Sequence, residues 1–349
     1  MTTRRHTLQM LGAATALGAT GLARAQSQRP FTFCSFGGAA GAALKTAFMD
    51  PASKKFGRPI TNVAPTNYAK FKAMVEAKAV EWDLVDVGGQ FIFQGRGQGL
   101  LEKLDFSIID TSKLAKHWVT DYGIYTFVGA TVFAYNTKAM PKDRVPTSWK
   151  DFWNVKDFPG PRSLYTRIWY NYEAALLAAG VPRDQVYPAT DEKVKLAFAK
   201  LREIKPHVKV WWTTGAQPAQ LLSSGEVAMA SAWSGRILDV MKENAPVNFT
   251  YQDAISWGEG FVVPKGAPNR ELAMRVLDYS ISEEAQSALL PLETYGPVLD
   301  SAAAKATAAQ AKIFVSHPAN MKDTCLINDE EVAKYATKFE EEWKKFQLS

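Results

Sequence analysis

Hydrophobic positions near the start of the chain alternate between the period of a strand and the period of a helix. Residues 31–36 alternate as a short strand, break at Gly37 and Gly38, and continue into a helical stretch that reaches Phe48. By the same pattern, the next elements are a strand at 60–64, a helix at 68–78 and a strand at 82–87. This alternation predicts an α/β fold with a parallel sheet.

A second α/β unit is predicted in the middle of the chain. The β-branched and aromatic run 128–135 is followed by a turn-rich stretch, 136–146, that has the composition of a boundary. Thr190 precedes a helix whose apolar positions recur at helical spacing as far as Ile204. The remaining elements of this unit are strands at 208–212 and 227–232 and a helix at 217–222.

The C-terminal part of the chain is predicted to return to the first unit. Residues 260–264 are strand-like, and 270–280 place apolar side chains on one face of a helix. The last helix has an apolar side and a charged side, which is typical of a surface helix packed on a domain. The predicted division is 26–136 for the first part of lobe 1, 137–259 for lobe 2, and 260–349 for the return to lobe 1 and the C-terminal helices.

The first 25 residues have the layout of a removable signal peptide. Arg4 and Arg5 precede an uncharged stretch at 7–23, and Ala23-Arg24-Ala25 forms a small-residue cleavage site. The paired arginines point to export of the folded protein through the twin-arginine translocon. A retained anchor is the alternative, although the stretch is short for a membrane-spanning helix. The predicted mature chain starts at Gln26.

Charge gives little support for a nucleic-acid partner. Loss of Arg4, Arg5 and Arg24 lowers the Lys and Arg count from 41 to 38 against 35 acidic residues, so the formal charge falls from +6 to +3. Two cysteines, Cys34 and Cys325, remain in an oxidising compartment. They form either a disulfide or two separately buried thiols, and the sequence leaves both alternatives open.

The chain lacks the common motifs of enzymes. His117, His207 and His317 are isolated from one another and from the cysteines, so no metal site is expected. Neither a Gly-x-Ser-x-Gly elbow nor a Walker A loop occurs, and the glycine-rich stretch 95–99 has Leu100 in a position that breaks a dinucleotide-binding pattern. We therefore expect no catalysis and no cofactor. A secreted hydrolase without a sequence motif is the alternative class.

Aromatic residues near predicted strand ends suggest a ligand site. Trp233 follows the strand at 227–232, Trp257 precedes the return to the first lobe, and Tyr295 lies in a Tyr-Gly-Pro turn. Open α/β sheets bind ligands at strand ends, and aromatic faces attract cations. Glu259 is placed to receive an ammonium group. The stretch around Thr214 lies between a strand and a helix, where its amides either bind an anion or simply cap the helix.

The whole mature chain resembles the spermidine/putrescine-type periplasmic solute-binding proteins, a branch of extracellular solute-binding protein family 1. The resemblance is carried, in order, by stretches 36–38, 82–86, 151–153, 158–162, 211–217, 225–233 and 261–267. It implies a two-lobe periplasmic-binding fold of type 2 with one small molecule bound between the lobes. It also implies hinge closure and delivery to the permease of an ABC importer, by a protein that works in the periplasm as a monomer.

The resemblance also implies a set of ligand-binding residues. In polyamine binders, aromatic walls and acidic residues hold the amines. The candidate residues here are Phe36, Gly37, Gly38, Gln90, Arg167, Tyr170, Thr214, Gln217, Trp233, Trp257, Glu259 and Tyr295.

Three departures from the polyamine pattern bear on the ligand. Glu259 stands where an Asp is expected, and Phe36-Gly37-Gly38 stands where a Trp is expected. Arg167 and Tyr170 occupy positions where polyamine binders have acids, and an Arg facing the cleft would suit a carboxylate. The predicted ligand is a polyamine-like cation. The alternative is an amino acid or ω-amino carboxylate, with Fe(III) or thiamine less favoured.

Overall fold

The computed structural model describes residues 29–292 and 295–349. The predicted signal peptide at 1–25 lies outside the described residues. Within them, no helix combines the length and the apolar character needed to cross a bilayer.

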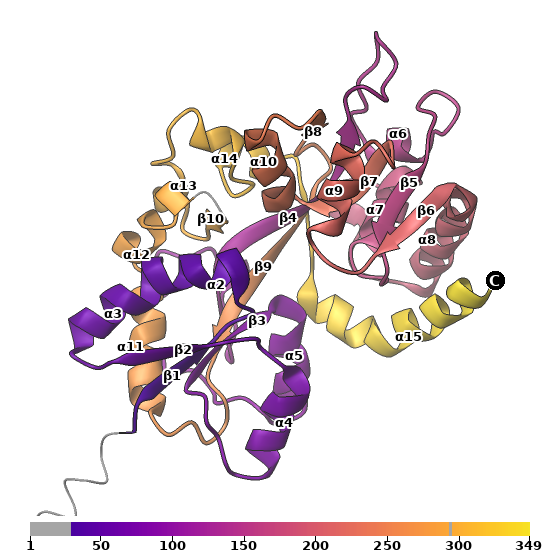
Figure 1. The fold of residues 1–349 in the computed structure, drawn as a ribbon. Helices are drawn as coiled ribbons and strands as arrows, with labels where there is room; N and C mark the ends of the chain where they lie inside the picture. The colour runs from indigo at the N-terminus through magenta and orange to yellow at the C-terminus, as the bar shows by residue number, and fades with distance from the viewer. Residues whose placement is uncertain (1–28, 293–294) are drawn as a thin grey trace, which may run out of the picture.

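The first lobe is built from the predicted alternation of strands and helices (Figure 1). Its elements are β1 (Phe31–Cys34), α2 (Gly38–Leu44), a π-helical segment (Lys45–Met49), α3 (Asp50–Phe56), β2 (Ile60–Val63), α4 (Tyr68–Glu76), β3 (Leu84–Gly88) and α5 (Gly89–Gly97). Strand β1 pairs in parallel with β2 on one side and β3 on the other. Helix α4 ends two residues earlier than predicted, with Lys78 in the left-handed region at φ 53°.

Two long antiparallel strands, β4 (Ile124–Asn136) and β9 (Ile255–Val262), connect the two halves of the molecule. Figure 1 shows both strands running between the two groups of helices. Strand β9 pairs with β3 over Glu259–Val262, whereas β4 pairs with β7 over Thr131–Tyr135. The sheet therefore continues through both lobes in the order β2-β1-β3-β9-β4-β7-β5-β6.

The second lobe repeats the α/β arrangement. Its elements are α6 (Trp149–Trp153), β5 (Arg162–Tyr165), α7 (Asn171–Ala178), α8 (Asp191–Ile204), β6 (Val208–Trp212), α9 (Gln217–Ser223), β7 (Met229–Trp233), α10 (Ser234–Lys242) and β8 (Val247–Phe249). Strand β5 pairs in parallel with both β6 and β7. The Thr190 side chain accepts a hydrogen bond from the Lys193 N–H, which confirms the predicted N-cap of α8.

The C-terminal elements first return to the first lobe, and the chain then passes back to the second lobe. They are α11 (Arg270–Ser280), α12 (Glu283–Ser287), β10 (Gly296–Pro297), α13 (Asp300–Ala303), α14 (Pro318–Met321), β11 (Cys325–Leu326) and α15 (Asp329–Leu348). Short 3-10 turns lie at Lys116–Trp118, Arg183–Gln185, Lys205–His207, Leu290–Leu292 and Gln310–Lys312. The apolar side of α15 packs on the second lobe, where Trp343 and Phe346 contact Phe198 and Trp211. The lobe limits predicted from the sequence remain a prediction.

The two cysteines are separate. Cys34 and Cys325 are both buried and both free, so of the two alternatives the structure has the separately buried thiols and not the disulfide. Burial raises the pKa of the Cys34 thiol to about 11. Burial raises the pKa of the Cys325 thiol as well, so neither thiol carries appreciable negative charge near neutral pH.

Candidate functional site

The carboxyl ends of the parallel strands in both lobes meet at the line where the lobes face each other. Strands β1 and β3 end there in the first lobe, and β5, β6 and β7 end there in the second. Ligands of open α/β sheets bind at these ends because the loops that follow parallel strands gather at one edge. Most of the residues predicted from the sequence follow directly after one of these strands.

Aromatic rings line the region where the two lobes face each other. Trp257 of β9 is 7% exposed, and its ring centroid lies 5.9 Å from that of Tyr295 and 6.4 Å from that of Tyr170. The indole N–H of Trp257 donates to Thr131 Oγ1 over 3.2 Å, which fixes the orientation of the ring. Trp233, at the end of β7, packs edge-to-face on Trp212 at 5.5 Å. The rings come from both lobes and from the strand between them.

Two glycines make room for the tryptophans. A Cβ added to Gly129 would lie 2.4 Å from the Trp257 ring, and one added to Gly215 would lie 2.4 Å from the Trp233 ring. Each ring therefore lies directly on backbone that carries no side chain. A glycine inside a strand often marks such a close approach, so Gly129 within the 128–135 run was the signal available in the sequence.

Two small cavities flank Trp257. The outer chamber, of about 40 Å³, is lined by Ala39, Ala40, Ala130, Trp233, Ser234, Gly235, Arg236, Asp239, Trp257 and Tyr295. The acid chamber, of about 50 Å³, is lined by Gly88, Gly89, Gln90, Trp169, Tyr170, Glu173, Trp257, Gly258, Glu259, Ile327, Asp329 and Val332. Because Trp257 belongs to both linings, one ligand could lie along its ring and reach into both chambers.

Carboxylates dominate the acid chamber. Burial raises the pKa of Glu259 to about 8. Burial also raises the pKa of Asp329 to about 7, although the Tyr125 hydroxyl donates to its Oδ2 over 2.7 Å. Among the ion pairs of the described residues, neither carboxylate has a Lys or Arg partner. The chamber therefore has carboxyl groups without a counter-cation, and a bound cation would favour their charged forms.

Asp86 adds a third acid close to Glu259. Strand β3 pairs with β9 so that Gly88 faces Glu259, which places Asp86 diagonally across from Glu259 on the same side of the sheet. Burial raises the pKa of Asp86 well above its usual range, the Glu259 charge raises it further, and only the Phe36 N–H opposes this. Neither Asp86 carboxylate oxygen has a hydrogen-bond partner of normal geometry. A cation near Glu259 would stabilise the charged forms of both Glu259 and Asp86.

Tyr170 is held in an unusual backbone conformation beside these acids. Its φ is 67°, in the left-handed region that a bulky residue seldom adopts. The Asn171 side chain fixes this turn, because its Nδ2 donates to the carbonyls of Tyr165 and Arg167. The conformation places the Tyr170 ring between Trp257 and Tyr165.

The outer chamber, unlike the acid chamber, carries a basic side chain, Arg236, together with one acid, Asp239. It is lined by Ser234, Gly235 and Arg236, the first residues of the nine-residue helix α10. Free N–H groups at a helix start favour an anion, and Arg236 adds a full positive charge. The Trp233 indole N–H is buried and lacks a hydrogen-bond partner. Arg236 lies 3.8 Å from Asp239, which is too far for a strong pair.

The structure brings six predicted residues into the two chambers. Gln90, Tyr170, Trp257 and Glu259 line the acid chamber, and Trp233, Tyr295 and Trp257 line the outer one. Asp86, Glu173, Asp329 and Arg236 were missed. For Asp86 the available signal was an acid inside an apolar strand, and for Arg236 it was a basic residue three positions after Trp233.

The other predicted residues lie nearby but line neither chamber. Phe36 is 38% exposed and packs edge-to-face on Tyr68 at 6.3 Å. Gly37 and Gly38 have positive φ, at 81° and 62°, and start α2.

The loops of the second lobe contribute less than predicted. Arg167 and Thr214 are exposed. The Gln217 side chain accepts a hydrogen bond from the Thr213 N–H, so it stabilises its own loop. Helix α9 has no side-chain cap, so Thr214 does not cap it with its side chain. The ligand roles of these residues stay predictions.

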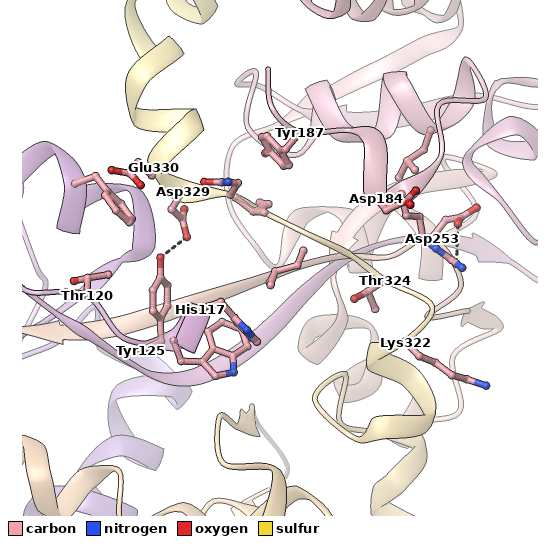
Figure 2. A pocket seen from close by; sticks show the side chains of 18 of the residues that line it. His117, Thr120, Tyr125, Asp184, Tyr187, Asp253, Lys322, Thr324, Asp329 and Glu330 are labelled. Carbon is pink, nitrogen blue, oxygen red and sulfur yellow. Dashed lines mark hydrogen bonds and ion pairs between the residues drawn. The ribbon is translucent and has the colours of Figure 1, made fainter. Parts of the chain in front are cut away.

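A larger groove of about 1360 Å³ lies on the other side of β9 (Figure 2). Successive strand residues alternate, so Trp257 and Glu259 point to the face opposite to that of Gly258. Gly258, Ile327 and Asp329 line both the groove and the acid chamber, so the two cavities adjoin at these residues. Figure 2 shows Tyr125 pointing to Asp329, to which its hydroxyl donates a hydrogen bond. Arg183 here pairs with Asp253 and Asp323. The groove is built of mixed, mutually paired charges, unlike the acid chamber.

Comparison with known proteins agrees with this arrangement. The family described as bacterial extracellular solute-binding protein matches residues 47–316. The chain belongs to this family. A gamma-aminobutyric acid (GABA)-binding protein from Pseudomonas aeruginosa is 35% identical over 88% of each chain. Relatives at 26% identity or less are named spermidine/putrescine-binding periplasmic proteins.

Solved structures share the whole fold. An ABC transporter substrate-binding protein from Bradyrhizobium japonicum is 38% identical, with a TM-score of 0.86 over 91% of this chain and 99% of that one. A GABA receptor is 33% identical, with a TM-score of 0.82 over 91% of this chain and 98% of that one. The two-lobe periplasmic-binding fold predicted from the sequence is confirmed. This solute-binding protein is the periplasmic receptor of an ABC importer.

Proposed function

We propose that this solute-binding protein takes an ω-amino carboxylate of the GABA type. The observation that carries the proposal is the different charge of the two chambers on either side of one tryptophan ring: the acid chamber has acids and no basic residue, and the outer chamber has Arg236 with only one acid, Asp239. Glu259 and Asp329 lie at one end, and Arg236 with the start of α10 lies at the other. A molecule with an ammonium at one end and a carboxylate at the other satisfies both.

The acid chamber suits the ammonium group. Three buried acids, Asp86, Glu259 and Asp329, lie near it with raised pKa values, because burial disfavours their charged forms. An ammonium supplies the missing positive charge together with three N–H donors. The face of Trp257 gives the methylene chain an apolar surface and favours the adjacent cation.

The outer chamber suits the carboxylate group. The first N–H groups of α10 and the Arg236 guanidinium favour an anion, and the unpartnered Trp233 indole N–H is a further donor. A polyamine, the ligand first predicted from the sequence, would instead place a second cation beside Arg236. This repulsion favours the ω-amino carboxylate, and the GABA-binding names of relatives support the same choice.

We further propose that the protein acts by hinge closure without bond chemistry, as an exported monomer that uses the twin-arginine route. Strands β4 and β9 exchange partners between the lobes around Thr131 and Trp257, so bending there would open the chambers to solvent. The chambers hold acids, aromatics and one Arg, and the proposed role of each is to bind charge or to cover the solute.

A ligand panel tests the proposal. Purified mature protein is screened by thermal shift and calorimetry against GABA, putrescine, spermidine, α-amino acids, thiamine and Fe(III). GABA is expected to bind most tightly and to raise the melting temperature, because a ligand that binds only the folded state stabilises it by RT ln(1 + [L]/Kd). Preference for putrescine over GABA would overturn the ω-amino carboxylate assignment and leave the receptor role intact.

Replacing Arg236 with Ala is expected to weaken GABA binding by about 1 to 2 kcal/mol. The side chain is 43% exposed, so solvent screens part of its attraction for the carboxylate. Putrescine, which has no carboxylate, is expected to bind equally well or better. Calorimetry with both ligands measures the difference, and Arg275→Ala, which removes an exposed Arg from α11, is the control. Equal losses for both ligands would contradict the proposed orientation.

GABA affinity is expected to rise with pH between about 6 and 8. In the free protein Glu259 holds a proton below its pKa of about 8, and an ammonium must displace that proton. One linked proton changes affinity by up to about tenfold per pH unit, while GABA keeps both charges throughout this range. Calorimetry in buffers of different ionisation enthalpy would detect the released proton. Constant affinity from pH 6 to 8 would contradict the role of Glu259.

The same group makes the unliganded protein less stable as the pH rises. The folded pKa of Glu259 is raised from an ordinary value of 4.5 to about 8, so between these values the folded chain binds more protons than the unfolded chain. The free energy of unfolding therefore falls as the pH rises through this window. The stabilisation by GABA is expected to grow over the same window, which thermal unfolding with and without ligand would show.

A further inference from the structure

The acid chamber continues beyond Glu259 to Glu173, an acid that the binding of a simple ammonium does not explain. Glu173 lies in the first turn of α7, is 2% exposed and lines the chamber with Glu259 and Asp329. Tyr187 donates its hydroxyl to Glu173 Oε1. The other oxygen, Oε2, is buried and has no hydrogen-bond partner. A buried acceptor without a partner is costly, so this oxygen is available to a ligand.

The three carboxylates come from three different elements and surround one side chain. Glu259 belongs to β9, Asp329 to the start of α15 and Glu173 to α7. The charges of all three carboxylates raise the pKa of Tyr170, so its hydroxyl interacts electrostatically with each of them. No group of three or more His, Cys, Asp or Glu in residues 29–292 and 295–349 is placed to hold a metal ion. The three carboxylates are therefore spread too widely to coordinate a single metal ion together.

We propose that the acid chamber is also a guanidinium site, so that the receptor takes ω-guanidino carboxylates such as 4-guanidinobutanoate as a second ligand class. An ammonium has three donors on one atom, whereas an alkylguanidinium is planar and spreads its N–H donors over three nitrogens. One edge pairs with Glu259 and Asp329, and the outer nitrogen reaches Glu173 Oε2. The carboxylate end stays at Arg236, so this proposal rests on the proposed function.

Calorimetry on wild-type protein is the first test. The ligands are GABA, 4-guanidinobutanoate and 4-(trimethylammonio)butanoate, whose head group is cationic but has no N–H donor. We expect 4-guanidinobutanoate to bind within about threefold of GABA or more tightly, and the trimethylated compound to bind at least about a hundredfold more weakly. If GABA binds and 4-guanidinobutanoate is more than about thirtyfold weaker, the guanidinium site is refuted and the proposed function stands. If neither binds, both proposals fail.

The variant Glu173→Gln tests the role assigned to Glu173. It keeps the shape of the side chain and removes its charge, so it is expected to weaken 4-guanidinobutanoate at least about tenfold and GABA less than about threefold. Thermal unfolding of the variant without ligand shows whether it is folded. Equal weakening of both ligands would overturn the assignment of Glu173. The wild-type ligand series still decides the proposal if the variant does not fold.

Discussion

Replacing Glu259 with Gln is expected to weaken GABA binding by about 2 to 5 kcal/mol, because the ligand ammonium then lies buried without its main charge partner. The substitution keeps the size of the side chain and leaves Asp329 and Asp86 in place. It also removes the group with the pKa of about 8, so the rise of affinity between pH 6 and 8 is expected to flatten. Calorimetry across this pH range measures both effects.

The matched control is Glu243→Gln, an exposed acid just after α10. It is expected to change GABA affinity by less than about 0.5 kcal/mol. If Glu259→Gln itself changed the affinity by less than threefold, the ammonium site would lie elsewhere in the cleft. Weakened binding with an unchanged pH dependence would instead show that another acid releases the proton.

The substitution Gly129→Ala is expected to lower the free energy of unfolding by about 1 to 3 kcal/mol and to abolish measurable GABA binding. The added methyl would lie 2.4 Å from the Trp257 ring, so the ring or strand β4 must move. A displaced Trp257 would no longer separate and cover the two chambers. Chemical denaturation measures the stability, and calorimetry measures the binding.

Gly97→Ala at the end of α5 is the control, because an added Cβ there meets no atom within 4 Å. It is expected to leave GABA binding unchanged and to leave stability unchanged or raise it by up to about 1 kcal/mol. The double variant Gly129→Ala with Trp257→Phe is expected to recover part of the lost stability, since the smaller ring leaves space for the methyl. If the effects of the two substitutions on stability were simply additive, the close contact between Gly129 and Trp257 would be contradicted.

Local sequence pattern was sufficient for much of the architecture. Strand β1, the helix that follows the glycine pair, and the capped helix α8 were predicted because their periodicity and turn residues are local properties. Glu259 was predicted as a ligand residue from its place two residues after Trp257, and it lies inside β9. Trp233 was predicted as a ligand residue from its place at the end of a strand. In a parallel α/β sheet the strand ends define the ligand site, so a residue can be assigned to it from its position after a strand.

Other features depended on contacts between distant parts of the chain. Glu173, Glu259 and Asp329 are separated by long stretches of sequence, and only the packing of α7, β9 and α15 brings them to one chamber. Their raised pKa values arise from burial, which is a property of the folded molecule.

The residues of the cleft also fall into those that local sequence predicts and those that only long-range packing places. The sequence by itself determined the receptor fold, and it predicted the aromatic walls and one acid of the site, because these follow from local pattern and from family motifs. The tertiary structure decided that Arg236, and not Arg167, lines a chamber, because helix direction and lobe contact set where a side chain lies. It also placed Gly129 under Trp257, a contact between neighbouring strands that are far apart in the sequence.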